Sequence, residues 1–349
     1  MTKLVILPGD GIGPEIIDAS LPILEKVSEK FNLEFSMETA DFGGNAYDKH
    51  GNPFPDETWE KVQNSNAVIL GSVGGPKWDD LPRELRPEAA LLGIRKRLGL
   101  YCNIRPVKYH DILASKVVWK EEYIKGVDIV IIRELTGGAY FGAKGRDEHK
   151  AFDNIEYTAE EVERIVRRGF EIAMNRKKVL HSVDKANVLE SSRLWREVTL
   201  RVAKEYPEVR LEHLYVDNAA LQLVINPKQF DVIVTENMFG DILSDQAAAL
   251  AGSLGMLPSA SLGGEIGVYE PAHGSAPDIA GQDKANPLAT ILSLAMMLRF
   301  TCKNEEAAKA IEVAVEKVMN AGFATIDIAG PNSKLVGTKE MAELVLKEI

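Results

Sequence analysis

The 349-residue sequence predicts an α/β fold, because strand-like and helix-like segments alternate along the whole chain. Several strand candidates, such as 67–70 and 127–132, are nearly continuous runs of apolar residues, which is typical of strands buried on both faces. Polar residues follow the later strands, and ligands usually bind at the carboxyl ends of strands in such sheets. At roughly 150 residues per domain, the length corresponds to two domains.

The elements can be assigned in chain order from local patterns. Residues 4–7 predict a short buried strand, and Pro14 opens an amphipathic helix to about residue 30, because proline is favoured in the first turn of a helix. Thr158 and Glu161 have the spacing of a capping box, and apolar residues follow them at helical spacing. Three further strands are expected at 179–183, 211–216 and 230–234, followed by Asp184-Lys185, Asp217-Asn218 and Thr235-Glu236-Asn237.

Composition and charge exclude several classes of protein. The 41 Lys and Arg against 52 Asp and Glu give a formal net charge of −11, whereas general nucleic-acid binding or attachment to an anionic membrane needs a basic surface. The longest apolar run, 288–298, is well short of the ~20 residues that cross a bilayer. The first apolar residues are too few for a signal peptide, and the two cysteines, Cys102 and Cys302, lie in no CxxC pair. We expect no nucleic-acid or membrane partner, reduced thiols and a cytoplasmic location.

Residues 8–15, with the sequence PGDGIGPE, connect the first predicted strand to the first predicted helix. Their spacing is close to the GxGxxG fingerprint of dinucleotide-binding folds, but that fingerprint needs a third glycine where this chain has Pro14. The segment therefore predicts a tight strand-to-helix connection and not a standard Rossmann turn.

Asp241 and Asp245 lie four residues apart in the segment 237–245, so on a helix they share one face. Two neighbouring carboxylates repel each other unless a cation lies close to them, and oxygen donors suit Mg²⁺ or Mn²⁺. The alternative is a solvated acidic face stabilised by the helix dipole. Asp217, at the end of another predicted strand, offers a third carboxylate and favours the metal interpretation.

Three arginines, Arg95, Arg105 and Arg133, are candidates for binding an anion. Arg133 ends an apolar strand, where a guanidinium group is costly without an anionic partner. Because guanidinium groups bind carboxylates bidentately, three of them could hold a di- or tricarboxylate. Ordinary ion pairs, for example with Glu88 or Glu134, are the alternative.

Tyr140, in a glycine-flanked loop, and Lys185, after a predicted strand, are candidates for proton transfer. A tyrosine can donate a proton when a nearby lysine or metal lowers its pKa. An aromatic loop anchor and a solvated lysine are the alternatives, and the spacing of the two residues does not decide between them.

The segment 270–281 is rich in small residues around His273, which would let backbone amides approach a phosphate closely. Asp278 would repel a 2′-phosphate and accept hydrogen bonds from a ribose 2′-hydroxyl, which favours NAD over NADP. A turn-rich surface loop is the alternative for this segment.

Together these segments resemble the β-decarboxylating dehydrogenases of 2-hydroxy acids, the family that includes isocitrate and 3-isopropylmalate dehydrogenases. The most specific element is 237–245, which continues into the sequence GSLGM at 252–256, and the segments 71–76 and 273–281 accompany it. Within the family, 86–95 (RPEAALLGIR) is similar to the branch that acts on 3-isopropylmalate.

Isocitrate enzymes carry a serine- and asparagine-bearing segment at this place to hold an extra carboxylate. Leu91 and Leu92 would instead cover an isopropyl group, since leucines gain from covering an alkyl group and cannot hold a carboxylate without severe desolvation. The resemblance therefore implies NAD-dependent oxidative decarboxylation of (2R,3S)-3-isopropylmalate to 4-methyl-2-oxopentanoate and CO₂, in leucine biosynthesis. The rival substrates within the family are D-malate, tartrate and homoisocitrate, and the alternative from another class is a non-catalytic regulatory subunit.

The resemblance also implies a role for each candidate residue. Tyr140 would protonate C3 of the substrate, and Lys185, through a water and Asp217, would remove the hydroxyl proton. The divalent cation, Mg²⁺ or Mn²⁺, would be held by Asp217, Asp241 and Asp245. The substrate carboxylates would be bound by Arg95, Arg105 and Arg133. The residues implied to contact NAD are Ile12, Gly74, Gly75, Glu88, His273, Gly274, Ser275, Ala276, Asp278 and Asn286.

The implied architecture has two α/β domains, and its cofactor site is not a Rossmann fold. This agrees with the presence of Pro14 where the Rossmann fingerprint needs a glycine. Residues 1–99 and 253–349 would form a discontinuous cofactor-binding domain, and 100–252 a domain for dimerisation and for substrate and metal binding. In the family the second domain forms a homodimer, so that a monomer should be inactive. The residues expected to reach the partner's active site are Lys185, Asp217, Asn187 and Val188.

Overall fold

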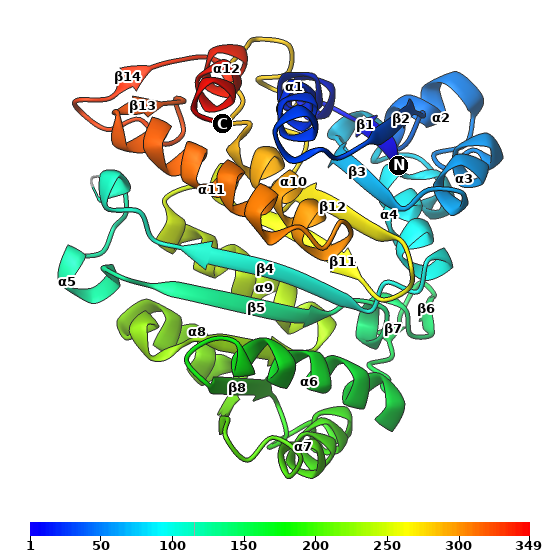
Figure 1. Ribbon diagram of the computed structural model, residues 1–349. Helices are drawn as coiled ribbons and strands as arrows, with labels where there is room; N and C mark the ends of the chain where they lie inside the picture. The colour runs from blue at the N-terminus through cyan, green and yellow to red at the C-terminus, as the bar shows by residue number, and fades with distance from the viewer. Residues whose placement is uncertain (115) are drawn as a thin grey trace. The chain divides into compact units, whose positions relative to one another are not determined.

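The computed structural model describes residues 1–114 and 116–349 and confirms the mixed α/β architecture. The chain divides into two compact units (Figure 1). Unit 1 comprises Met1–Gly99, Ile112–Lys116 and Gly252–Ile349, and unit 2 comprises Leu100–Asp111 and Val117–Ala251. The assignment of cofactor binding to one unit and of dimerisation to the other stays a prediction. Cys102 and Cys302 are free thiols, as expected.

Unit 1 is built on a sheet whose strands are β1 (Thr2–Gly9), β2 (Phe35–Thr39), β3 (Ala67–Ser72), β11 (Pro258–Leu262) and β12 (Gly267–Pro271). Their order is β2-β1-β3-β12-β11, with β11 antiparallel to β12 and the other pairs parallel. β3 is buried along its whole length, as its apolar run predicts.

The helices of unit 1 cover this sheet. α1 (Gly13–Phe31) has Pro14 in its first turn, as predicted, and α10 (Leu288–Phe300) packs against β11 and β12. The longest apolar run of the sequence is therefore a buried core helix, and none of the helices in the described ranges is long and apolar enough to cross a membrane. The remaining elements are α2 (Gly44–His50), α3 (Asp56–Gln63), α4 (Pro87–Arg97), α11 (Glu305–Asn320), β13 (Phe323–Ala324), β14 (Lys334–Leu335) and α12 (Thr338–Glu348).

The strands of the sheet in unit 2 are β4 (Cys102–Lys108), β5 (Asp128–Glu134), β8 (Val179–Asp184), β9 (Arg210–Tyr215) and β10 (Val232–Thr235). The order is β4-β5-β10-β8-β9, with β4 antiparallel to β5 and the other pairs parallel. The carboxyl ends of β5, β8, β9 and β10 therefore meet at one edge of this sheet, where their polar residues are expected to gather.

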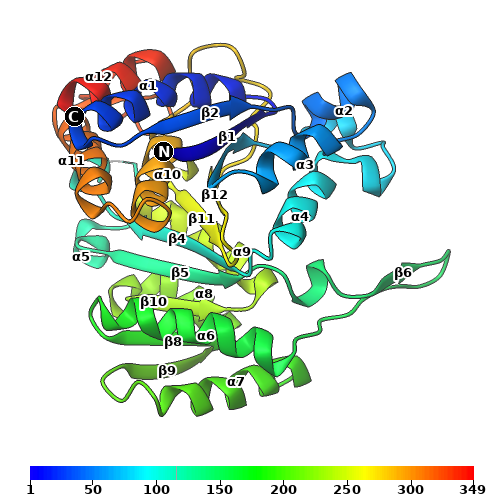
Figure 2. The same ribbon diagram turned by 45° about the vertical axis from the view of Figure 1, so that its right-hand side comes forward.

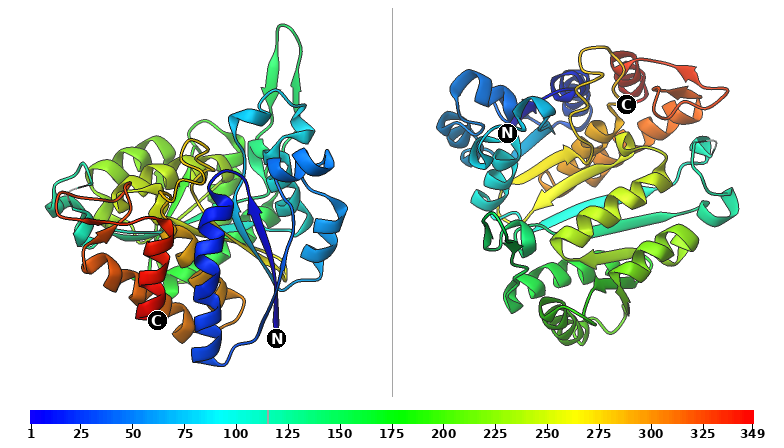
Figure 3. Two further views of the ribbon diagram at one scale, coloured as in Figure 1. Left: turned by 90° about the horizontal axis from the view of Figure 1, so that it is seen from above. Right: turned by 180° about the vertical axis from the view of Figure 1, so that it is seen from behind.

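Helices cover both faces of the unit 2 sheet. α6 (Ala159–Met174) packs on β5, β8 and β10 with α7 (Glu190–Ala203) beside it, and α9 (Asn237–Ala248) packs on β4 and β5 with α8 (Val216–Ile225) beside it. Figures 1 and 3 show the two pairs on opposite faces. The predicted capping box of Thr158 and Glu161 is present at the start of α6. The short helix α5 (Glu121–Ile124) and the hairpin of β6 (Lys144–Arg146) and β7 (Ala151–Asp153) complete the unit, and Figure 2 shows the hairpin projecting from it.

Candidate active site

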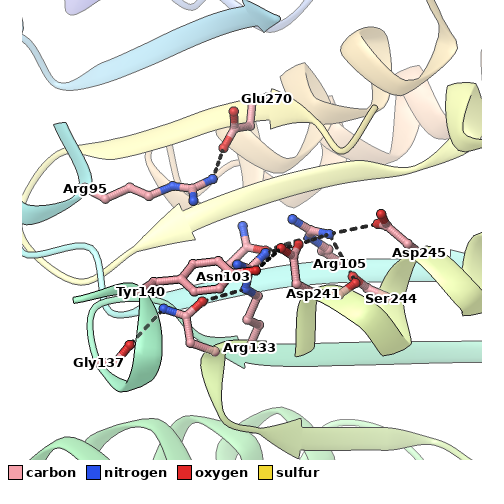
Figure 4. A network of polar contacts seen from close by, with 11 residues as sticks. Arg95, Asn103, Arg105, Arg133, Gly137, Tyr140, Asp241, Ser244, Asp245 and Glu270 are labelled. Atoms are coloured by element: carbon pink, nitrogen blue, oxygen red, sulfur yellow. Dashed lines mark hydrogen bonds and ion pairs between the residues drawn. The ribbon is translucent and has the colours of Figure 1, made fainter. Parts of the chain in front are cut away.

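Unit 2 carries a cluster of polar side chains around Asp241 on α9 (Figure 4). Arg133, near the end of β5, donates from Nη1 to Asp241 Oδ1, and the Tyr140 hydroxyl donates to Asp241 Oδ2 at 2.8 Å. Arg105 on β4 lies 3.5 Å from Asp241 Oδ1 and 3.4 Å from Asp245 Oδ1, measured from its Nη1. The structure thus brings together two predicted arginines, the predicted proton donor and two of the predicted metal ligands.

The close approach of α9 to β5 makes this cluster compact. A Cβ atom at Gly240 would lie 2.7 Å from Arg133 Cβ, so only glycine fits at this place in the helix. The side chains of Arg105 and Arg133 are only 7% and 2% exposed. Each guanidinium group is further fixed through its Nε, which donates to Asn103 Oδ1 at 2.8 Å in Arg105 and to Asn237 Oδ1 at 3.0 Å in Arg133. Both groups are therefore held in one orientation.

Tyr140 is a protonated phenol in this cluster. Burial, together with the hydrogen bond to Asp241, raises the pKa of Tyr140, so that the hydroxyl keeps its proton at neutral pH. The guanidinium carbon of Arg133 lies 5.4 Å from the centroid of the ring. The sequence suggested a lysine or a metal that would lower this pKa, whereas the structure places a carboxylate on the hydroxyl. The arrangement makes Tyr140 suited to donate a proton.

Lys185 and Asp217 form a separate pair at the ends of β8 and β9. Lys185 Nζ donates to Asp217 Oδ1, and this bond lowers the pKa of Asp217. Asp217 lies in the first turn of α8 and is 65% exposed, and the neighbouring Asn187 and Val188 are also exposed. No group of three His, Cys, Asp or Glu side chains suited to a metal is found among the described residues. Asp217 of one chain thus does not join Asp241 and Asp245 of the same chain in a metal site. A site formed by all three residues stays a prediction, which requires Asp217 from a second chain.

On unit 1, α4 presents the predicted specificity residues on one face. Glu88, Leu91, Leu92 and Arg95 follow one another at intervals of three, one and three residues, which is the spacing of neighbours along a helix. Arg95 Nη2 donates to Glu270 Oε1 at 3.1 Å, and both side chains are largely buried (Figure 4). Arg95 Nε is buried and has no hydrogen-bond partner in the described part of the chain. A buried donor without a partner is suited to receive an anionic ligand.

The three loops predicted to bind the cofactor are joined by hydrogen bonds within unit 1. The fully buried carboxylate of Asp10 accepts from the backbone N–H groups of Gly44, Asn45 and Gly74 at 2.7–2.9 Å. Ser275 Oγ donates to the carbonyl oxygen of Gly74 at 2.7 Å, and the backbone N–H of Ile12 donates to the carbonyl oxygen of Ser275 at 2.8 Å. The segments 8–15, 71–76 and 273–281 thus form one connected surface. No local pattern marks Asp10 as a functional residue, although it lies within the PGDG turn at residues 8–11.

The other cofactor candidates lie along the same segments. Ile12 packs with Ile16 and Ala285, and Ala276 packs against this cluster. His273 donates from Nδ1 to the carbonyl oxygen of Gly274 (2.9 Å), while its Nε2 is buried without a partner in the described ranges. Asp278 is exposed. The candidates not yet placed are Gly75, which follows Gly74 in its loop, and Asn286, whose Nδ2 donates to Asp327 Oδ2 at 3.0 Å.

Glu236, immediately before α9, is a buried carboxyl group whose unusual pKa no local sequence pattern indicates. It is 3% exposed and accepts one hydrogen bond from Ser192 Oγ at 3.1 Å. Burial, with the nearby carboxylates of Asp184 and Glu134, raises the pKa of Glu236 to about 7.

We expect Glu236 to make the folded state less stable as the pH rises. Because its pKa is higher when folded, the folded state binds the proton more tightly, and the resulting stability is present below pH ~4.5 and lost as the pH passes 7. Glu236→Gln should therefore match the wild type at pH 5 and be more stable at pH 8.5, by about 3 kcal/mol at most. Urea unfolding of both proteins at the two pH values measures this, and a difference that is the same at both would contradict the assignment.

Comparison with known proteins gives one consistent result. The family model described as isocitrate/isopropylmalate dehydrogenase matches residues 3–345. Proteins named 3-isopropylmalate dehydrogenase from Clostridium acetobutylicum and Moorella thermoacetica are 58% and 56% identical to the chain, cover 99% and 100% of it, and are each covered over 99% of their own length. The protein of the same name from Pseudomonas putida is 55% identical, with 99% of this chain and 98% of the relative covered.

Solved structures agree with this result. The structure of isocitrate dehydrogenase from Methylococcus capsulatus has a TM-score of 0.88 at 33% identity, with 100% of this chain and 99% of that chain covered. A β-decarboxylating dehydrogenase from Thermococcus kodakarensis has a TM-score of 0.81 at 36% identity, with 100% and 96% covered. The match runs through both units of the chain.

Proposed function

The chain belongs to the isocitrate/isopropylmalate dehydrogenase family, and from this we infer that it oxidises and decarboxylates 3-isopropylmalate to 4-methyl-2-oxopentanoate and CO₂, with reduction of NAD⁺, in leucine biosynthesis. The observation that carries the chemistry is the cluster around Asp241, where two buried guanidinium groups and a protonated phenol converge. The substrate follows from the relatives of that name and from Leu91 and Leu92, which offer an alkyl group an apolar surface on α4.

The arginines bind the two carboxylates of the malate portion in this proposal. Arg105 and Arg133 are buried and fixed through Nε, so they can meet a carboxylate without losing further side-chain freedom. Arg95, whose buried Nε has no partner among residues 1–114 and 116–349, supplies a further donor. Orientation of the substrate by these groups places C2 and C3 for reaction.

The carboxylates of α9 fit a hard divalent cation. Asp241 and Asp245 offer oxygen donors from successive turns, with side chains 33% and 56% exposed, and Asp217 of a second chain would complete the set. When bound, Mg²⁺ or Mn²⁺ supplies Lewis-acid stabilisation of the negative charge that develops on the substrate oxygen, and NAD⁺ accepts the hydride from C2. With a cation on the two aspartates, Arg105 and Arg133 would be released from them to bind the substrate.

Two groups of the chain move protons. Lys185 with Asp217 takes the proton of the 2-hydroxyl, through a water, as the hydride leaves C2. After the C3 carboxylate departs as CO₂, Tyr140 donates its proton to C3 and completes the 2-keto acid. A phenol is protonated at neutral pH, so Tyr140 holds this proton until the carbanionic centre forms.

The enzyme works as a homodimer in this proposal. In one chain Lys185 is bonded to Asp217 and the pair lies outside the Asp241 cluster, so each site needs the pair from its partner. Exposed apolar side chains on α8 and α9 provide a surface for the partner, namely Leu221, Val224, Ile225 and Ile242. As a biosynthetic enzyme with two free thiols, it would act in the reducing cytoplasm.

NADH absorbance tests the function directly. The purified protein is assayed with Mg²⁺ on 3-isopropylmalate, isocitrate, D-malate, tartrate and homoisocitrate, with and without EDTA. EDTA-sensitive turnover confined to 3-isopropylmalate is expected. Preference for another of these acids would overturn the role of Leu91 and Leu92 while keeping the mechanism, and no turnover on any of them by a metal-loaded dimer would favour a regulatory subunit.

A charge reversal in the cofactor segment should change the choice of nucleotide. Asp278→Lys combined with Ile279→Tyr should shift the ratio of kcat/KM for NAD to that for NADP toward NADP, because the lysine attracts the 2′-phosphate that Asp278 repels. Asp278 is exposed, which makes its replacement by lysine compatible with folding, whereas Ile279 is partly buried and packs against Ile12, Ile16 and Ala285. Steady-state rates with both nucleotides measure the ratio, and an unchanged ratio would show that adenosine binds elsewhere.

A further inference from the structure

Asn237, the first residue of α9, is fully buried, and both polar atoms of its side chain are bonded. Its Oδ1 accepts from Arg133 Nε at 3.0 Å, and its Nδ2 donates to the carbonyl oxygen of Gly137 at 3.1 Å. A rotation of the amide by half a turn would set donor against donor and acceptor against acceptor. The side chain is therefore held in one orientation, between the end of β5 and the loop that leads to Tyr140.

A second contact fixes the same loop. The backbone N–H of Asn237 donates to the Tyr157 hydroxyl oxygen at 2.9 Å. That hydroxyl lies directly beneath Gly138, where a Cβ atom would come within 2.4 Å of it, and Gly138 has a φ of +68°. Asn237 thus bonds the turn 137–140 directly at Gly137, and it also bonds Tyr157, whose hydroxyl packs against the same turn at Gly138.

The position of Tyr140 depends on this turn. Its hydroxyl reaches Asp241 Oδ2, one helical turn after Asn237, and Arg133 reaches Asp241 Oδ1. One amide side chain therefore connects the proton donor to the guanidinium group that binds the substrate. A group that transfers a proton to carbon must lie within hydrogen-bond reach of it, and a displacement of about 1 Å can lower the rate by about 10²-fold.

We propose that Asn237 is a positioning residue for the final protonation step, which holds the Tyr140 loop in register with Arg133 through its side-chain amide. The proposal rests on the function proposed above. It assigns to Asn237 an effect on proton transfer at C3 that is larger than its effect on substrate binding. A residue with a merely structural role would lower stability and leave the rate of that proton transfer unchanged.

The test uses exchange of the C3 protons of 4-methyl-2-oxopentanoate with D₂O, followed by NMR, with Mg²⁺ and without NAD. This exchange is the reverse of the protonation step and involves no hydride transfer. Asn237→Ala removes both side-chain bonds, and Asn237→Asp has the same size and keeps an acceptor for Arg133 but loses the donor to Gly137. The matched control is Asn103→Ala, because Asn103 is equally buried and accepts from the other guanidinium Nε, that of Arg105.

Both Asn237 variants should lower the exchange rate and kcat by about 10²-fold. Asn103→Ala should instead raise KM for 3-isopropylmalate and retain the exchange rate at saturating 2-keto acid. Thermal unfolding shows whether each variant folds. If Asn237→Ala does not fold, the isosteric Asn237→Asp provides the test of the proposal. A folded Asn237 variant with wild-type exchange would overturn the proposal, whereas a wild type without activity on 3-isopropylmalate would overturn the function itself.

Discussion

Tyr140→Phe is expected to lower kcat by about 10²- to 10⁴-fold, the contribution of a positioned general acid. The change removes only the hydroxyl that donates to Asp241 Oδ2 and leaves the aromatic ring beside the Arg133 guanidinium group. Substrate binding should therefore change little, and NAD affinity not at all, since the NAD candidates lie on unit 1. Steady-state kinetics and a fluorescence titration with NAD measure the two effects.

Tyr109→Phe provides the matched control. Tyr109 is also on unit 2 and largely buried, but its hydroxyl has no hydrogen-bond partner among the described residues. Loss of that hydroxyl should leave kcat unchanged. Should Tyr140→Phe turn over at the wild-type rate, another group must protonate C3, and the proposed role of the phenol would be wrong.

The second large effect is expected at the other proton-transfer group. Lys185→Met should also lower kcat by about 10²- to 10⁴-fold, because the methionine side chain cannot accept the hydroxyl proton. The change also releases Asp217 from its hydrogen bond, so the affinity for Mg²⁺ should change as well. Rates at varied Mg²⁺ separate the loss of the base from the weaker binding of metal.

Mixed dimers distinguish a shared site from a site within one chain. Co-expression of Tyr140→Phe chains with Lys185→Met chains yields hybrid dimers, in which one site would combine Tyr140 of one chain with Lys185 of the other. Random pairing should restore about a quarter of the wild-type activity. No restoration, with hybrid dimers demonstrated by affinity tags, would place Lys185 in the site of its own chain.

Local sequence patterns were sufficient to predict the helices and strands and the most polar residues of the candidate active site. Pro14 marks the start of α1, and the capping box of Thr158 marks the start of α6, because both effects depend only on neighbouring residues. Asp241 and Asp245 could be placed on one helical face for the same reason. Asp217 follows its strand as predicted, although the strand ends one residue early and Asp217 lies in the first turn of the next helix.

Contacts between distant segments could not be predicted in this way. The bonds of Asn237 to Arg133 and Gly137 join residues about a hundred positions apart, and nothing in the local sequence indicates which partners its amide will meet. The same holds for the carboxyl group of Glu236, whose pKa depends on burial beside Asp184 and Glu134. Many of the residues predicted to bind ligands carry charge and are conspicuous in the sequence, whereas the residues that hold them in place, such as Asn237, are neutral and buried.

The hydrogen bonds of Asp10 have a consequence for protein engineering. Its carboxylate connects the turn after β1 to the start of α2 and to the loop after β3, and Ser275 attaches the segment after β12 to the same loop. A loop grafted alone from a relative with another nucleotide preference would leave backbone N–H groups without their acceptor. These segments must be exchanged together, as one cassette, with Asp10 retained.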